Sequence, residues 1–394
     1  MATKTVRDFS KRGDAIPVPP LTRVQGEAYE RLIQLDTEPL KRDAIGIEGL
    51  LREVFPIEAY DGSMRVEYLY YKLDEPRYTI DECKELRLTY GRPFKIGVRF
   101  VRDGIAEVLE EEIYIGEVPI LIGGGEFIIN GSERVIVGLE DLSYNKIIVD
   151  AEKVGGKKVF KAKVYSSIVG YRAKLELVLK EDGLIVARIP GSPVDIPIIT
   201  LMRALGLESD KEIASVISLN ETIQNELESS FEKTDVTTSK DSIVYISKRI
   251  APGMLEEFQI KRAETLLDWG LLPHLGKQPD NRKEKTQFLG EAACKLLELK
   301  LGWIQPDDKD HYGNKVVKFA GQMLADLFRT AFRNLVRDMK YQLERSGQKR
   351  GINAVSAAIR PGIISDKLNN AIATGNWGRG RVGVTQLLDR TNYL

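Results

Sequence analysis

Three consecutive glycines, Gly123–Gly125, are the first residues whose type and spacing suit a chemical task. A glycine-rich turn can hold a phosphate against backbone N–H groups when it joins a strand to a helix, usually with Lys and Ser or Thr following. Here the apolar run Glu126–Asn130 follows without a Lys, and the G-x-G-x-x-G spacing fails at these glycines. The pattern favours a turn between two strands, and Asn130-Gly131 predicts a second turn.

A metal site is the second candidate. Residues 306–315 gather carboxylates beside His311, but the calcium-loop spacing fails at Tyr312 and Phe319. We predict a polar loop there, and a packed histidine at His274, which lies between leucines. The two histidines and the two distant cysteines, Cys83 and Cys294, form no zinc pattern. No GxSxG, HExxH or Walker motif occurs, so we expect no catalytic residue and no metal on this chain.

The C-terminal part is the third candidate, because its composition suits nucleic acid. Residues 313–394 hold 14 Lys or Arg against 5 Asp or Glu, a formal charge of +9 that the rest of the chain balances with −9. Such a distribution indicates a polyanionic partner. Glycines in Gly375–Gly383 allow the backbone to approach a ligand closely. Charge for phosphates and a stacking surface come from Arg379, Arg381, Arg390 and Trp377.

A basic stripe lies earlier in the same part of the chain, before Gly375. The apolar periodicity predicts a helix over Lys315–Ser346, and Arg329, Arg333 and Arg337 lie on it at i, i+4 spacing. A stripe of this kind is consistent with a solvent-exposed face and equally with contact to a polyanion. Both interpretations stay open at this stage.

The elements that must position these residues follow from the periodicity. Residues 64–73 and 93–102 alternate as strands, Gly155-Gly156 predicts a hairpin, and Asp182-Gly183 predicts a two-residue hairpin. The pattern then becomes helical. We predict an α+β protein in which residues from about 155 to 312 form a separate insertion, with its strands first and its helices after.

Composition sets the broad class. With 394 residues, 43% hydrophobic and 29% charged, the chain is neither disordered nor fibrous in type. No apolar run approaches the roughly 18 to 20 residues that span a bilayer, and the N-terminus lacks a secretory signal. We expect a cytoplasmic protein without a membrane partner.

Several stretches resemble one family, the second-largest subunit of multisubunit DNA-directed RNA polymerases (β in bacteria, B in archaea). Residues 55–100 resemble the start of bacterial β, and residues 113–137 resemble a stretch shared across the family. Residues 332–347 and 373–394 resemble archaeal and eukaryotic members. The matches follow the family's order from about residue 45 onward, so the chain is identified as similar to the N-terminal part of this subunit.

The resemblance implies a multidomain α+β fold in which a protrusion is interrupted by an inserted lobe. The protrusion would comprise residues 1–154 and 313–374, the lobe residues 155–312, and residues 375–394 would begin the fork. In this family the protrusion and the lobe form one jaw of the DNA cleft, and the fork approaches the RNA–DNA hybrid.

The last residues resemble the segment that lines the rifampicin pocket of bacterial enzymes. Gln386, Asp389, Thr391 and Asn392 fall on matching positions, whereas Leu387 and Arg390 differ, so the resemblance predicts neither sensitivity nor resistance to the drug. The nucleic-acid site expected from composition and resemblance together, with no catalytic member, is Arg379, Arg381, Gln386, Asp389, Arg390 and Asn392.

The resemblance also implies that the chemistry belongs to an assembled nucleotidyltransferase. In this family the largest subunit holds the catalytic magnesium, so we expect no cofactor on this chain. The implied partners are the largest subunit, the C-terminal part of the B subunit, the other polymerase subunits, DNA and the RNA–DNA hybrid. Some archaea divide the B subunit into two chains; this chain resembles the first piece, as a natural split or a shortened chain.

Two other functions are alternatives. A free-standing nucleic-acid-binding module is consistent with the basic residues 313–394, and a complete second-largest subunit encoded elsewhere in the genome would favour it. A nucleotide hydrolase built on Gly123–Gly125 would require nucleotide binding that Gly124→Val abolishes.

Overall fold

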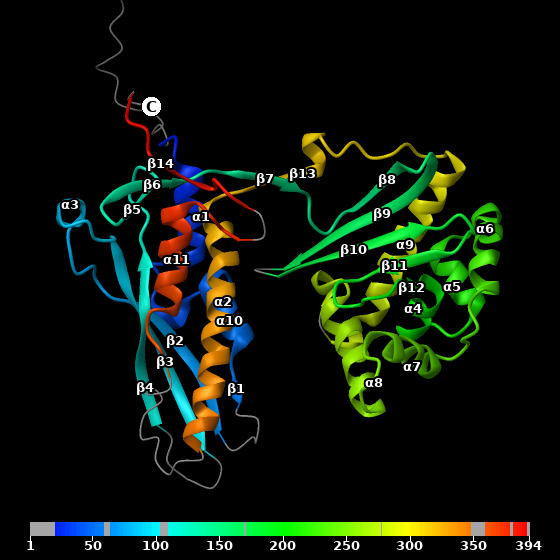
Figure 1. Cartoon of the computed structure of the whole chain (residues 1–394), viewed down its shortest axis with the longest axis horizontal. Helices are drawn as coiled ribbons and strands as arrows, with labels where there is room; N and C mark the ends of the chain where they lie inside the picture. Colours follow the sequence, from blue (N-terminus) through cyan, green and yellow to red (C-terminus); the bar gives the residue numbers. More distant parts are fainter. Residues whose placement is uncertain are drawn as a thin grey trace, which may run out of the picture. The chain divides into compact units, whose positions relative to one another are not determined.

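The computed structural model describes residues 20–58, 64–102, 109–168, 171–276, 278–347, 359–378 and 381–391. They form two compact units, one of Met1–Leu139 with Lys318–Leu394 and the other of Glu140–Val317 (Figure 1). The first unit is thus built from two segments of chain, and the second unit is inserted between them. Both units combine helices with antiparallel sheets, which confirms the predicted α+β class.

A four-stranded antiparallel sheet forms the base of the first unit. Its order is β1-β2-β3-β4, with the strands β1 (Ile57–Glu58), β2 (Met64–Leu73), β3 (Gly91–Arg102) and β4 (Leu109–Pro119). The alternation predicted for β3 is confirmed, since Phe94 and Ile96 are fully buried. Between them Lys95 reaches the opposite face, where it pairs with Asp74 and Glu112. One face of the sheet is therefore apolar and the other charged.

Helices from both chain segments cover the apolar face. The first segment supplies α1 (Arg23–Ile33), η1 (Pro39–Lys41) and α2 (Gly46–Val54), and the second supplies α10 (Ala320–Gly347) and α11 (Ile363–Thr374). In Figure 1, α10 (orange) runs along the sheet beside α2. Phe94 of β3 meets Phe328 of α10 edge to face, with 5.8 Å between the ring centroids. Aromatic burial therefore holds the two segments together.

The predicted start of the long helix is wrong. Lys315–Lys318 form strand β13, which pairs with β7 (Leu139–Leu142), and the helix begins at Ala320. The apolar periodicity extends into this strand, so spacing alone did not separate the two elements.

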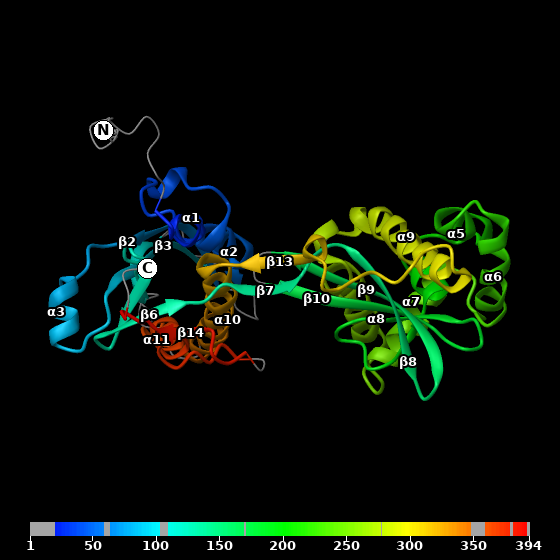
Figure 2. The ribbon, with the colours of Figure 1, turned by 90° about the horizontal axis from the view of Figure 1, so that it is seen from above.

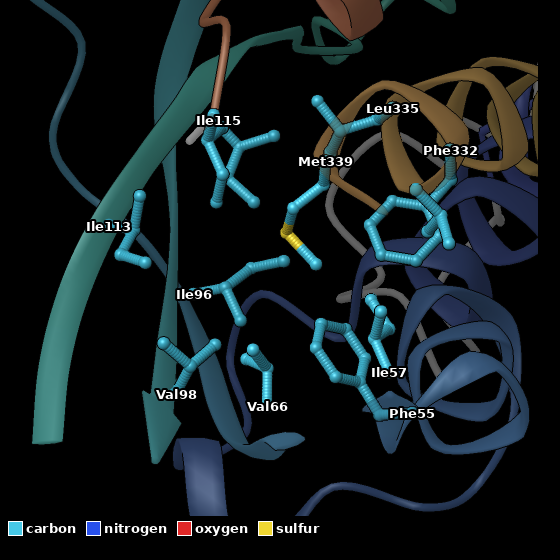
Figure 3. Close-up of a pocket in the computed structure, with 12 residues that line it drawn as sticks. Phe55, Ile57, Val66, Ile96, Val98, Ile113, Ile115, Phe332, Leu335 and Met339 are labelled. Atoms are coloured by element: carbon cyan, nitrogen blue, oxygen red, sulfur yellow. The ribbon is translucent and has the colours of Figure 1, made fainter. Parts of the chain in front are cut away.

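The core between the sheet and α10 is closely packed. Figure 3 shows a cavity lined only by apolar side chains, among them Ile96, Ile113 and Met339. Its volume is about 10 Å³, close to the space that one water molecule needs. Because no polar group lines it, this cavity is a packing defect of the core and offers no site for chemistry.

The two turns predicted around the glycines are confirmed. At Gly123–Gly125 the N–H of Gly125 donates to the Ile122 carbonyl over 2.8 Å. Strands β5 (Glu126–Ile129) and β6 (Ser132–Ile136) then pair, with Ile129 opposite Ser132 across the Asn130-Gly131 turn. Gly131 has a φ of +77°, and a Cβ there would lie 2.9 Å from the Cα of Arg87. This turn therefore packs against the segment that follows α3 (Ile80–Glu85).

The second unit contains a five-stranded antiparallel sheet of order β12-β11-β10-β9-β8. The strands are β8 (Ile147–Val154), β9 (Lys157–Ile168), β10 (Tyr171–Leu179), β11 (Ile185–Arg188) and β12 (Ile196–Pro197). The hairpin predicted at Gly155-Gly156 is confirmed. The one at Asp182-Gly183 exists, but its loop has three residues, because Lys180 N–H donates to the Leu184 carbonyl over 2.9 Å. By contacts this unit starts at Glu140, before the expected residue 155, since β8 pairs with β9.

Helices follow the strands in the second unit, as the pattern predicted. Helix α9 lies beside strands β8, β9 and β10 (Figure 2). The buried core joins α4 and α9 to the sheet. The helical elements are α4 (Ile198–Ala204), α5 (Asp210–Ile217), α6 (Glu221–Glu232), α7 (Ser239–Ile250), α8 (Glu256–Thr265), η2 (Leu266–Gly270), η3 (Pro273–Leu275), η4 (Pro279–Asn281), α9 (Arg282–Leu301) and η5 (Tyr312–Asn314).

Candidate nucleic-acid interface

Strands β5 and β6 with the Asn130-Gly131 turn, here called the glycine hairpin, form one sheet with the C-terminal tail, the chain from Gly375 onward. Strand β14 (Thr385–Leu387) pairs antiparallel with β6, in a three-stranded sheet of order β14-β6-β5. The register sets Gln386 opposite Val135 and Leu387 opposite Arg134. Figures 1 and 2 show β14 beside β6 at the end of α11. Two features that the sequence presents some 250 residues apart are therefore neighbours.

The chain enters this sheet through a close turn after α11. Gly375 has a φ of +71°, and a Cβ on it would lie 2.7 Å from the Thr385 carbonyl oxygen. The Trp377 indole N–H donates to the Thr385 hydroxyl over 3.0 Å, and the ring is half-buried against the core. Trp377, predicted as a stacking surface for a ligand, is therefore engaged by its own chain. It ties the loop to β14.

Ion pairs fasten the residues after β14 to the hairpin. The Arg390 guanidinium binds Glu133 through both arms, with Nε–Oε2 at 2.6 Å and Nη2–Oε1 at 2.9 Å. Lys84 of α3 reaches the same carboxylate, with Nζ–Oε1 at 2.7 Å. The Leu388 N–H donates to the Glu133 carbonyl over 3.1 Å. Glu133 therefore connects α3, β6 and the tail.

These contacts change the acidity of Glu133. Hydrogen bonds from Arg390 and then from Lys84 lower its pKa from 4.5 to about 2, against a smaller opposing effect of burial. The same bond raises the pKa of Arg390. A bidentate pair between Arg and a carboxylate has defined geometry, so it orients the tail as well as attracting it.

We expect the tail to leave the hairpin as the pH falls from about 4.5 toward 2. Glu133 binds its proton less tightly in the folded protein than in the unfolded chain. The contribution of the pair to stability is therefore complete above pH 4.5 and is lost as the pH falls through 2. Amide exchange of Val384–Leu388, compared with its intrinsic rate at each pH, reports this change.

The control for this titration is the same chain with Glu133→Gln. Because it lacks the carboxylate, its exchange in Val384–Leu388 should already be faster at pH 7, and the protection of these amides should not change between pH 4.5 and 2. Protection of Val384–Leu388 in the parent chain that stays constant down to pH 2 would contradict the assignment.

The structure brings together part of the predicted site. Gln386, Asp389 and Arg390 are exposed on and after β14, and Arg381 lies half-buried in the loop before it. The Arg381 carbonyl accepts a hydrogen bond from the backbone N–H of Trp377 over 3.0 Å, and this bond closes the loop. The two other predicted residues, Arg379 and Asn392, lie outside the described residues.

The arginine stripe on α10 is not one surface. Arg329 is buried and its Nη2 lies 2.7 Å from Glu53 Oε1. Arg333 and Arg337 are exposed. A single solvated or ligand-binding stripe is therefore wrong for Arg329. The buried face of α10 is broad enough to include this position.

Much of the basic charge in this part of the chain has acidic partners. Lys315, Lys318, Arg329, Arg360 and Arg390 each lie within 4.0 Å of a carboxylate oxygen. Three of the partners, Glu140, Glu53 and Glu133, lie outside residues 313–394 and offset part of the +9 excess, whereas Asp326 and Asp338 are already counted in it. Charge counting overstated what is available for a polyanion.

Sequence reasoning missed Glu133 and Lys84, because a Glu and a Lys in a turn-rich region carry no ligand pattern. The alternation Ser132–Ile136 did contain one usable signal, since it puts Glu133 and Val135 on the same face of β6. Nothing in the local pattern showed that this face adjoins Gln386.

The other candidate sites are structural. His274 packs against Phe288 and hydrogen-bonds Ser166 over 2.7 Å, as predicted for a packed histidine. In the polar loop His311 accepts from the Gly313 N–H over 3.0 Å. Within the described ranges, no group of three or more His, Cys, Asp or Glu is placed to hold a metal ion. No helix in the described part of the chain is both long and apolar enough to cross a membrane.

Comparison with known proteins starts with the second unit. A family model described as RNA polymerase Rpb2, domain 2, matches residues 143–318. This range almost coincides with the compact unit Glu140–Val317. The insertion is therefore a recognisable domain in sequence as well as in contacts.

Longer matches cover most of the chain. The DNA-directed RNA polymerase subunit Rpo2N of Methanococcus vannielii is 36% identical over 390 residues, covering 88% of this chain and 78% of that protein. This chain belongs to the Rpo2N family. The Rpo2N of Methanothermobacter thermautotrophicus (strain Winter) is 35% identical, with 88% of this chain and 79% of that protein covered. The resemblance read from the sequence motifs is thereby confirmed.

A longer type of relative also matches. The subunit Rpo2 of Saccharolobus solfataricus is 40% identical over 338 residues, which is 79% of this chain. The matched part is 30% of that protein's length. This member of the Rpo2N family therefore spans about a third of the Rpo2 relatives, and it corresponds to the N-terminal part of an archaeal second subunit.

Proposed function

We propose that this chain is the N-terminal part of the second-largest subunit of a DNA-directed RNA polymerase and acts in DNA-templated RNA synthesis. The observation that carries the proposal is the match to Rpo2N subunits over most of both chains. The names of these relatives describe polymerase subunits, and the same assembly suits this chain.

The fold supports a more detailed assignment. The first unit, made of two chain segments, suits the protrusion, and the inserted second unit suits the lobe. Residues from Gly375 onward begin the fork. In the proposed assembly the protrusion and lobe contribute one jaw of the DNA cleft. The sheet β14-β6-β5 faces the RNA–DNA hybrid.

The proposed contacts with nucleic acid lie on the tail. Arg379 and Arg381 supply charge to phosphates on a glycine-rich loop, and Gln386, Asp389 and Asn392 supply polar groups. Arg390 belongs to the same surface, with its guanidinium already bound to Glu133. Polar side chains on and around an edge strand suit contacts to a backbone rather than to one base sequence.

Catalysis is proposed to belong to the assembled enzyme. Two-metal nucleotidyl transfer needs carboxylates that converge on magnesium. We assign that site to the largest subunit, and we assign this chain a role in shaping the cleft. Its proposed partners are the largest subunit, the C-terminal part of the B subunit and the remaining polymerase subunits.

The test is purification of this chain from its own cells through an affinity tag. We expect the largest subunit and the C-terminal part of the B subunit to co-purify in equal amounts, together with template-dependent RNA synthesis. A matched sample with Gly321→Ala, whose added Cβ on α10 would lie 1.8 Å from the Ala28 carbonyl oxygen of α1, should recover less of both partners. Recovery of the intact chain without a largest subunit would contradict the proposal.

The free-standing nucleic-acid-binding module is less well supported. That function rested on the charge of +9 in residues 313–394. Three of the basic residues in that segment, Lys315, Arg329 and Arg390, pair with carboxylates from outside it, which reduces this excess. Binding by charge alone would therefore be weak, whereas a polymerase holds nucleic acid with several subunits at once.

A further inference from the structure

We infer that Glu133 is a positioning residue, which holds the C-terminal tail in the place where it meets nucleic acid. It acts through Arg390, and Lys84 completes the arrangement. This inference rests on the proposed function of the tail and adds a residue to it that lies far from the tail in sequence.

The geometry singles out Glu133 among the carboxylates of this surface. Its side chain is only 18% exposed, whereas Arg390 is 61% exposed. It receives both arms of Arg390 and the ammonium group of Lys84, and its backbone carbonyl accepts from Leu388. Glu126, the other carboxylate near Arg390, lies 3.9 Å from its Nη2. Glu133 is thus the carboxylate of this surface at which α3, β6 and the tail converge.

The location of the anchor sets what it can control. Strand β14 has only three residues and one partner strand, so few backbone hydrogen bonds hold it. The Trp377–Thr385 bond fixes the start of β14, and the Glu133–Arg390 pair fixes the residues beyond its end. Gln386 and Asp389 lie between these two attachments. Loss of the second attachment should free them without disturbing the buried core.

The hairpin that carries Glu133 is itself attached to neighbouring residues. Its hairpin turn at Asn130-Gly131 packs on the segment after α3, where the Gly131 N–H donates to the Leu88 carbonyl over 2.9 Å. Lys84 sits on α3 itself. Contacts with α3 and with the segment after it therefore fix the carboxylate, as is expected of a residue that positions another side chain.

Hydrogen exchange on the full chain tests the anchor without using polymerase activity. We expect Glu133→Gln to speed amide exchange in Val384–Leu388 about tenfold, with no change in α11. The matched control is Glu110→Gln, which breaks the pair with Arg99, at 2.8 Å in the main sheet, and should leave the tail unchanged. Equal exchange in Glu133→Gln and the unaltered chain would overturn the inference.

Combination with Arg390 tests whether Glu133 acts through that residue. The double variant Glu133→Gln/Arg390→Gln should exchange no faster than Arg390→Gln alone, and Arg390→Lys, which keeps the charge, should lie between that variant and the unaltered chain. Additive effects of the two substitutions would contradict a shared role.

Elongation by the assembled polymerase supplies the functional arm. Glu133→Gln should slow elongation several-fold while the subunits assemble normally, and Glu110→Gln should not. Faster tail exchange with unchanged elongation would overturn the positioning role. The proposed function would then stand or fall separately, by co-purification and by variants of Arg379 and Arg381.

Discussion

Gly321→Ala is expected to lower the free energy of unfolding of the first unit by about 3 kcal/mol, because it overpacks a contact between helices. A Cβ on Gly321 would lie 1.8 Å from the Ala28 carbonyl oxygen and 2.4 Å from its carbon. Both atoms belong to the backbone of α1, so no side chain can rotate away. Helices α1 and α10 would have to separate.

That separation would affect more than one contact. The Gln25 side chain of α1 accepts from the Ala320 N–H over 2.8 Å and donates to the Ile136 carbonyl over 2.9 Å. It therefore links α1, α10 and the end of β6. Displacement of α1 should also loosen the sheet that carries β14.

Gly26→Ala is the matched control for this experiment. Gly26 lies on the same helix α1, and a Cβ there meets nothing within 4 Å. Alanine has a higher helix propensity than glycine. This variant should therefore be as stable as the unaltered chain or more stable by about 0.5 to 1 kcal/mol. Urea unfolding followed by far-UV circular dichroism measures both. Similar behaviour of the two variants would contradict the close contact of α1 with α10.

The largest functional effect is expected from Arg379→Gln combined with Arg381→Gln. If each arginine makes one charged contact with a phosphate, worth about 1.5 kcal/mol, the pair should slow transcript elongation roughly 100-fold. Assembly of the subunits should stay unchanged, because the loop that carries Arg381 is closed by backbone hydrogen bonds between Trp377, Gly378 and Arg381. Elongation on a defined template and subunit stoichiometry are the two measurements.

Charge removal elsewhere on the same unit provides the control. Arg31 of α1 and Arg65 of β2 are exposed, and their double replacement by Gln removes the same charge. It should change elongation less than twofold. An equal loss of elongation and of assembly in the Arg379 and Arg381 variant would remove these residues from the proposed site.

Local patterns in the sequence predicted most of the strands and turns. The Asn130-Gly131 and Gly155-Gly156 hairpins were found because positive φ angles require those residues. The alternation of β3 was found because one face is buried. These features depend on neighbours in sequence, so a single chain is enough to show them.

Pairings between distant residues were not predictable in this way. The partners Arg390 and Glu133, or Arg329 and Glu53, are 257 and 276 residues apart in sequence. Nothing in the composition of a basic tail shows which cations are already neutralised. The family resemblance supplied the order of the parts, and the structure supplied the sheet that joins the glycine hairpin to the tail.

Photocrosslinking from Gln386 tests the central claim most directly. A photoreactive phenylalanine analogue at this exposed position of β14, in a polymerase assembled on a template and stalled during elongation, should crosslink to the RNA or DNA of the hybrid. The same analogue at Glu110, exposed on β4 of the main sheet, should give no such product. A polymerase that assembles and transcribes, yet shows no crosslink from position 386 or equal crosslinks from both positions, would contradict the account.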